Sequence, residues 1–134
     1  MQVIIGSDPV AVREGLAILL ACSEMSSLGE GARGKAEIVL AEVLNNIVEH
    51  AYADKAGDIC VDLERQAEGV FVVVSDEGRP FPNEELPQGA LPQIEGMDDL
   101  PEGGFGWFLI RTLVRGLTYR RNEAGNFVSF LLPA

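Results

Sequence analysis

The segment from Lys35 to Tyr52 places apolar residues three or four positions apart over about five helical turns. These residues are Leu40, Val43, Leu44, Ile47 and Ala51. Because positions i, i+3, i+4 and i+7 share one side of a helix, the spacing predicts an amphipathic helix over 35–52. Such a helix needs a second layer of structure to cover its apolar side.

Short apolar segments supply candidate strands for that second layer. Residues 59–63 alternate, residues 70–74 are a β-branched run, and a turn at 67–69 separates the two segments, so they predict a hairpin. A further strand is predicted at 2–5, and a second hairpin is predicted from 117–121 and 127–132 around Ala124 and Gly125.

Two more helices complete the predicted order of elements. Ser7-Asp8-Pro9 is a helix start that leads to about Cys22, and a helical pattern returns from Gly106 to Arg115. The stretch from Ser23 to Gly34, rich in serine and glycine, is expected to be a loop. The fold class that follows is α+β, a two-layer sandwich whose mixed or antiparallel sheet carries helices on one face.

Length and charge limit the function further. With 134 residues, 47% of them hydrophobic, we expect a single domain over 1–134. The longest apolar stretch, Leu16 to Cys22, is too short to span a bilayer, so a soluble, cytoplasmic protein is expected. Cys22 and Cys60 lack CxxC spacing and are expected to be ordinary buried thiols.

A formal net charge of -11 would repel anionic polymers and surfaces, so neither nucleic acid nor a membrane is an expected partner. The same negative charge repels the phosphate groups of a nucleotide. Any nucleotide site here therefore needs local compensation from Mg²⁺, backbone N–H groups or a helix N-terminus.

Glu42, Asn46 and His50 form a polar line beside the apolar stripe of the predicted helix. Asparagine offers Mg²⁺ a neutral oxygen and glutamate can accept a proton, so together they suit a metal-assisted proton transfer. The alternative is a solvated helix face. Two adjacent asparagines, Asn45 and Asn46, are nevertheless an unfavourable choice in the middle of a helix.

Asp76 ends the apolar strand at 70–74, and Gly78 follows two positions later. A carboxylate at a strand end can accept a hydrogen bond from the amine of a purine, and glycine lets the backbone approach the base. An ordinary turn explains the same residues.

Glycines at 103, 104 and 106 run directly into the third predicted helix, whose first N–H groups are available to an anion. The pattern matches neither a P-loop nor a dinucleotide fingerprint, and a plain loop-to-helix junction is the alternative. Before it, residues 79–103 hold five prolines and six acidic residues, a composition expected of a lid or a disordered insert.

In this order and spacing the three elements resemble the nucleotide site of the GHKL ATPase superfamily over nearly the whole chain. The resemblance is greatest to the anti-sigma-factor serine/threonine kinases, in which a Glu-x-x-x-Asn-x-x-x-His-Ala-Tyr helix, an Asp-x-Gly turn and a Gly-Gly-x-Gly-x-x-Leu-Ile-Arg segment recur. It implies ATP and Mg²⁺ as cofactors and residues 79–103 as the ATP lid.

The resemblance also implies a role for each matching residue. Glu42 is the implied general base, Asn46 the Mg²⁺ ligand, and Asp76 the adenine acceptor, with Gly78 against the base and Gly104, Phe105 and Gly106 along the phosphates. His50 is either a support for the site or a structural residue. Asn126 stands where the family often has a threonine near the adenine, and it either substitutes for that threonine or forms a turn.

The implied activity is phosphorylation of a serine or threonine of an anti-sigma-factor antagonist, with a sigma factor as the second partner and a homodimer as the assembly. The alternative is a non-catalytic, nucleotide-binding module of the same fold that regulates by sequestering a partner.

Overall fold

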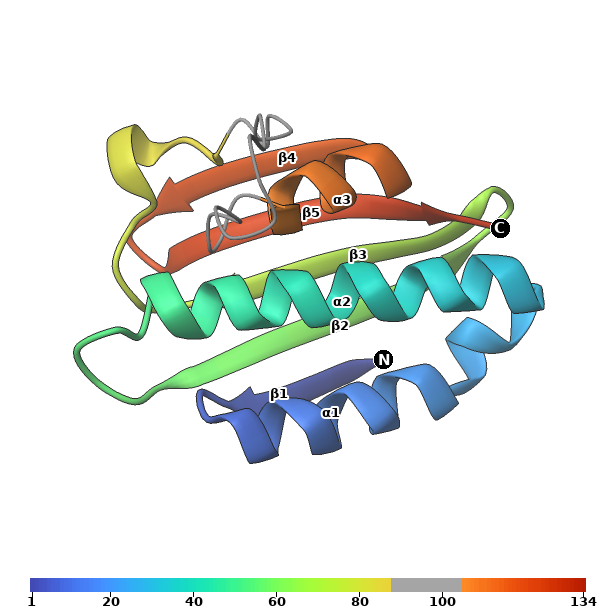
Figure 1. Ribbon diagram of the computed structural model, residues 1–134, viewed down its shortest axis with the longest axis horizontal. Helices are drawn as coiled ribbons and strands as arrows, with labels where there is room; N and C mark the ends of the chain where they lie inside the picture. Colours follow the sequence, from blue (N-terminus) through green and yellow to red (C-terminus); the bar gives the residue numbers. More distant parts are fainter. Residues whose placement is uncertain (88–104) are drawn as a thin grey trace, which may run out of the picture.

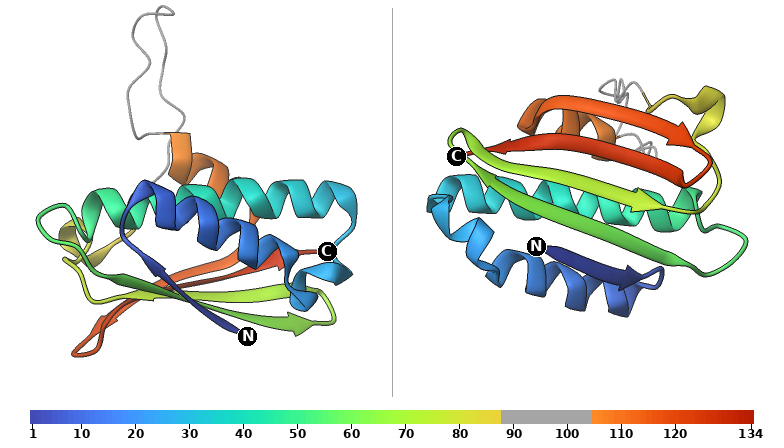
Figure 2. Two further views of the ribbon diagram at one scale, coloured as in Figure 1. Left: turned by 90° about the horizontal axis from the view of Figure 1, so that it is seen from below. Right: turned by 180° about the vertical axis from the view of Figure 1, so that it is seen from behind.

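The structure, a computed structural model, describes residues 1–87 and 105–134 and is an α+β sandwich of two layers (Figure 1). Five antiparallel strands form one sheet in the order β1-β2-β3-β5-β4. The helices lie on one face of the sheet, and the other face is open, as the edge-on view in Figure 2 shows. The predicted fold class is confirmed.

The elements follow one another along the chain in the predicted alternation. They are β1 (Gln2–Gly6), α1 (Pro9–Ala21), η1 (Ser23–Ser27), α2 (Glu30–His50), β2 (Asp58–Gln66), β3 (Gly69–Asp76), η2 (Pro82–Glu84), α3 (Phe105–Leu113), β4 (Arg115–Asn122) and β5 (Gly125–Pro133), where η marks a short 3₁₀ helix. In the part of the chain described, no helix has both the length and the apolar character to cross a membrane.

The core lies between α2 and the inner face of the sheet. The whole predicted stripe of α2 is buried, with Leu40, Val43 and Leu44 fully inaccessible. In β3 and β5 every second residue points inward, as strand geometry requires. Asp76 and Asn126 continue these inward rows at the ends of the two strands, where they pair directly across the ladder. Two polar side chains are thereby placed at the edge of an apolar core.

The start of α1 follows its local sequence. Asp8 is the N-cap residue, and its Oδ1 accepts a hydrogen bond of 2.9 Å from the backbone N–H of Ala11. Pro9 occupies the first helical position, where its missing N–H costs nothing. The predicted helix start is confirmed.

The prediction of a loop from Ser23 to Gly34 is wrong. Residues 23–27 form η1, and α2 begins at Glu30 with Gly29 as its N-cap. Tertiary contacts override the weak helix propensity of this stretch. Met25 is fully buried, and the Arg33 guanidinium donates to the backbone oxygen of Leu20 at the end of α1.

The third helix also ends earlier than predicted. It runs from Phe105 to Leu113, so Arg115 belongs to β4 and not to the helix. The pairing of β4 with β5 is irregular between Arg115 and Thr118, and Gly116 there adopts a φ of 64°. A glycine takes this conformation without steric cost, which lets the strand begin directly after the helix. Cys22 is buried, Cys60 is half-buried, and both are free thiols.

Candidate active site

The start of α3 lies directly against the polar line of α2. A Cβ atom built on Gly106 would stand 2.6 Å from Oε2 of Glu42 and 3.2 Å from Nδ2 of Asn46. A side chain at this point would displace the Glu42 carboxylate, because both distances are shorter than ordinary van der Waals contact. The structure therefore brings the glycine segment and the Glu-Asn pair, which are about 60 residues apart in sequence, into one place.

Within the pair, Asn46 is 6% exposed and Glu42 is half-buried. The Asn46 amide nitrogen donates a hydrogen bond of 2.7 Å to the backbone oxygen of Glu42. The side-chain oxygen of Asn46 therefore points away from that backbone oxygen. One neutral oxygen and one carboxylate are thus held beside the N-terminus of α3.

Asp76 is 4% exposed at the end of β3. Its Oδ1 accepts hydrogen bonds from the Gly78 backbone N–H at 2.8 Å and from Nδ2 of Asn126 at 2.9 Å. Its Oδ2 is buried and has no hydrogen-bond partner among the described residues. Burial raises the pKa of this carboxyl, while the bonds from Asn126 and Gly78 and the charge of Arg121 oppose the rise. A buried acceptor without a partner is uncommon in folded proteins, and a donor on a water molecule or a ligand can bond to it.

Gly78 joins the Asp76 turn to the C-terminus of α2. A Cβ atom on Gly78 would stand 2.3 Å from the backbone oxygen of Ala51, and the next N–H, that of Arg79, donates to the same oxygen at 2.9 Å. Asn46 lies on α2 and Ala51 is the C-cap residue of that helix, so α2 and its cap carry both the Glu-Asn pair and the support of the Asp76 turn.

Aromatic side chains fill the space beside the Asp76 turn. Phe81 is 2% exposed and contacts Trp107, Tyr119 and the exposed His50, with ring centroids 5.6, 5.3 and 6.0 Å away. The indole N–H of Trp107 is buried and has no partner in the described part of the chain. His50 therefore lies against an aromatic ring at the rim of the site.

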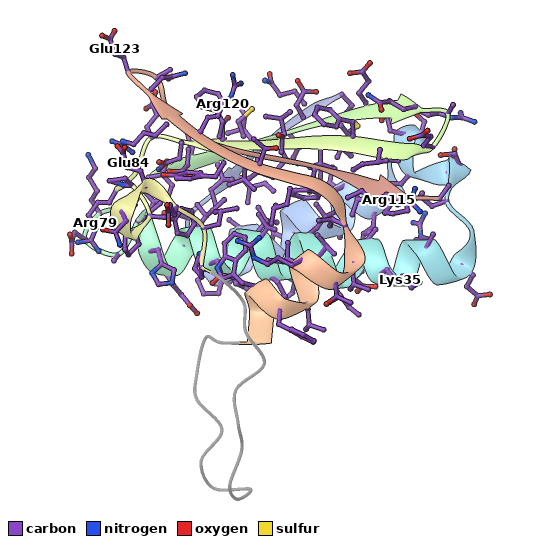
Figure 3. All side chains as sticks on the ribbon, turned by 90° about the horizontal axis from the view of Figure 1, so that it is seen from above. Lys35, Arg79, Glu84, Arg115, Arg120 and Glu123 are labelled. Carbon is purple, nitrogen blue, oxygen red and sulfur yellow. The ribbon has the colours of Figure 1, made fainter. Side chains whose placement is uncertain are left out.

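Within residues 1–87 and 105–134, no ion pair or hydrogen bond joins a Lys or Arg side chain to Glu42 or Asn46. Arg79 lies beside η2 and pairs at 3.0 Å with Asp54, both side chains being exposed (Figure 3). Lys35 and Arg115 lie at the opposite end of α2 (Figure 3), and Lys35 is about 16 Å along the helix from Asn46.

Part of the predicted site lies outside the described residues. This holds for Gly104 and for residues 88–103 of the predicted lid, while Phe105 is described only as the first residue of α3. Of the lid's first residues, Phe81 and Leu86 are buried, and Arg111 of α3 donates to the Pro87 backbone oxygen at 2.9 Å. Within residues 1–87 and 105–134 no group of three or more His, Cys, Asp or Glu side chains is suited to hold a metal ion.

Most of the chain matches a known protein family. Residues 5–132 match the model of the histidine kinase-like ATPase domain. The chain belongs to this family. The histidine kinase domain of a blue-light activated histidine kinase from Erythrobacter litoralis EL346 has the same fold. It superposes with a TM-score of 0.56 at 16% identity, over 92% of this chain and 59% of that one.

Curated relatives of this histidine kinase-like ATPase domain include serine-protein kinases named RsbW. That of Staphylococcus aureus is 35% identical over 70% of this chain and 61% of the relative. That of Halalkalibacterium halodurans is also 35% identical, over 58% of this chain and 49% of the relative. The matched region thus spans about half to three-fifths of the relatives' length.

Sequence reasoning missed two residues of the candidate site. Tyr119 and Arg121 of β4 both reach Asn126 Oδ1, the tyrosine hydroxyl at 2.7 Å and the guanidinium at 2.9 Å. Their spacing of two on a predicted strand places them on one face, and this signal was present in the sequence. The spacing does not indicate which strand lies opposite these two residues.

Proposed function

We propose that residues 1–134 act as one histidine kinase-like ATPase domain that binds Mg-ATP and transfers the γ-phosphoryl group to a serine or threonine of an anti-sigma-factor antagonist. A sigma factor is the proposed second partner, sequestered while the antagonist is phosphorylated, and a homodimer is the proposed assembly. The observation that carries the proposal is the contact of Gly106 with Glu42 and Asn46.

The adenine is proposed to bind at Asp76. Its unpartnered Oδ2 is a buried acceptor, and the exocyclic amine of adenine is a donor. The Gly78 backbone is packed tightly on Ala51, so the turn behind the base is rigid. The nucleotide would run from there along α2 toward Glu42 and Asn46.

The phosphates are proposed to lie between α2 and the N-terminus of α3. Gly106 has no side chain that would fill the space beside Glu42 and Asn46, and the first N–H groups of α3 are suited to an anion. The Asn46 oxygen would be the protein's ligand to Mg²⁺, an ion that prefers oxygen ligands. The bound Mg²⁺ would neutralise phosphate charge that the described cations do not reach.

Glu42 is the proposed general base. Its carboxylate would accept the proton of the serine or threonine hydroxyl as the hydroxyl oxygen forms its bond to the γ-phosphorus. The bond from that phosphorus to the bridging oxygen breaks, and the electron pair leaves with ADP. Phosphoryl transfer depends mainly on positioning and electrostatic stabilisation, which α2 and α3 would provide together.

The Glu42→Ala variant tests the proposal. It should keep Mg-ATP affinity while single-turnover transfer from labelled ATP to the antagonist falls about 10²–10⁴-fold, the usual loss without a general base. Glu37→Ala is the matched control, since Glu37 is an exposed glutamate on another face of the same helix. Transfer by Glu42→Ala at the wild-type rate would remove Glu42 from the mechanism. Wild-type protein that binds ATP without any transfer would instead favour the sequestering module.

A further inference from the structure

Asn126 is completely buried, and its side-chain amide is fully hydrogen-bonded. Its Nδ2 donates to Oδ1 of Asp76 and to the backbone oxygen of Arg79, both at 2.9 Å, and lies 3.3 Å from the backbone oxygen of Gly78. Its Oδ1 accepts from the Tyr119 hydroxyl and from the Arg121 guanidinium. A primary amide has two N–H groups and two oxygen lone pairs, so no capacity is left for a ligand.

These partners also fix which way the amide faces. A rotation by 180° would turn the amide oxygen toward Asp76 Oδ1 and the N–H groups toward the Arg121 guanidinium. Both contacts would join groups of like polarity and leave buried atoms without partners. Asn126 therefore presents a donor to Asp76 at all times.

The orientation of the Asp76 carboxylate follows from this contact. Its Oδ1 is held between the Asn126 amide and the Gly78 N–H, so the plane of the carboxylate cannot rotate without breaking one of these bonds. Oδ2 is then the one carboxylate oxygen that remains for a ligand, and its direction is set.

We propose that Asn126 is a positioning residue for base recognition, which holds Asp76 so that Oδ2 faces the exocyclic amine of the nucleotide. This inference rests on the proposed function, in which Asp76 reads the base. Asn126 does not touch the base itself. It supplies, from a strand position opposite Asp76, the donor that keeps the carboxylate in one orientation.

The electrostatics agree with this role. Burial raises the pKa of Asp76, and the hydrogen bond from Asn126 is the largest of the effects that oppose the rise, ahead of the Gly78 N–H and the Arg121 charge. Without Asn126 the carboxyl would take up a proton more readily. A protonated Oδ2 would be a hydrogen-bond donor, and it would then face a second donor, the amine of adenine.

The Asn126→Thr and Asn126→Val variants test the inference as a matched pair. Threonine and valine have nearly the same shape and both suit a strand, but only threonine can donate a hydrogen bond to Asp76. The affinities for ATP and for inosine triphosphate, which carries a carbonyl oxygen in place of the amine, are measured by titration calorimetry with Mg²⁺. Threonine should retain the wild-type ratio of the two affinities within about threefold, whereas valine should lower ATP affinity about tenfold and bring the ratio close to one.

An Asn126→Val variant that keeps the wild-type ratio would overturn the inference. Ser129→Val on the same strand, where the side chain is on the other face of the sheet, controls for the change to valine. If Asn126→Val does not fold, Asn126→Ser and Asn126→Ala decide as a second matched pair, because only serine can donate a hydrogen bond to Asp76. Alanine should narrow the ratio at least about threefold relative to serine, and equal ratios in the two variants would again overturn the inference.

The failure of the proposed function gives a different result. If wild-type protein does not bind ATP, or if Asp76→Asn leaves the ratio unchanged, base reading by Asp76 is wrong and the inference falls with it. If Asp76→Asn changes the ratio and Asn126→Val does not, only the role of Asn126 is wrong.

Discussion

Replacing Asp76 by asparagine should reverse the preference of the site from ATP to inosine triphosphate. Oδ1 of Asp76 receives N–H donors from Gly78 and Asn126, so the oxygen of the new amide must take that place. Its NH₂ group then occupies the position of Oδ2 and faces the base. A donor there meets the adenine amine unfavourably and the inosine carbonyl favourably.

The magnitude follows from the burial of the pair. Asp76 is 4% exposed and its neighbour Asn126 is 0% exposed, so water cannot replace a lost hydrogen bond between Asp76 and the base. A buried polar group without its partner costs about 1–3 kcal/mol. At about 1.4 kcal/mol for each tenfold change, ATP should bind the Asp76→Asn variant about 5- to 150-fold more weakly than wild type.

Titration calorimetry of both nucleotides with Mg²⁺ measures this change. Glu77→Gln removes the same charge from the next, exposed residue and should leave the ratio of affinities unaltered. Because burial raises the pKa of Asp76, its ionised form is disfavoured in the folded state, and the variant without nucleotide should be at least as stable as wild type. An Asp76→Asn variant that is folded and still prefers ATP as strongly as wild type would refute the reasoning.

Three further predictions concern the phosphate end of the site and its stability. Gly106→Ala should slow single-turnover transfer about 10²-fold, because its Cβ would displace Glu42 Oε2, only 2.6 Å away. Asn46→Ala should weaken ATP binding in Mg²⁺ but not in EDTA, and equal losses in both would make the residue structural. The raised pKa of Asp76 means that the folded state keeps a proton which the unfolded chain releases near pH 3.8. Its contribution to stability is therefore full below that pH and is lost as the pH rises through the raised value. Denaturant unfolding of wild type and Asp76→Asn over a pH series should show this difference, and parallel curves would contradict it.

Much of the fold could be predicted because its signals are local. The apolar stripe of α2, the alternation of β2 and the Asp8-Pro9 helix start each depend on neighbouring residues alone, and all three are confirmed. The first turns of α2 could not be predicted in this way. Met25 of η1, just before them, is buried in the core, and Arg33 contacts α1, so both interactions depend on distant parts of the chain.

The candidate site, like the fold, could be predicted only where its signals are local. Residue type and spacing along the chain single out Glu42, Asn46, Asp76 and Gly106 as candidates, and the resemblance to the GHKL superfamily implies their roles. The contact of Gly106 with α2 and the network of Asn126 with Asp76, Tyr119 and Arg121 exist only in the folded chain. They require the register of three strands and the packing of two helices, which long-range burial selects, and no local pattern encodes which strand faces which.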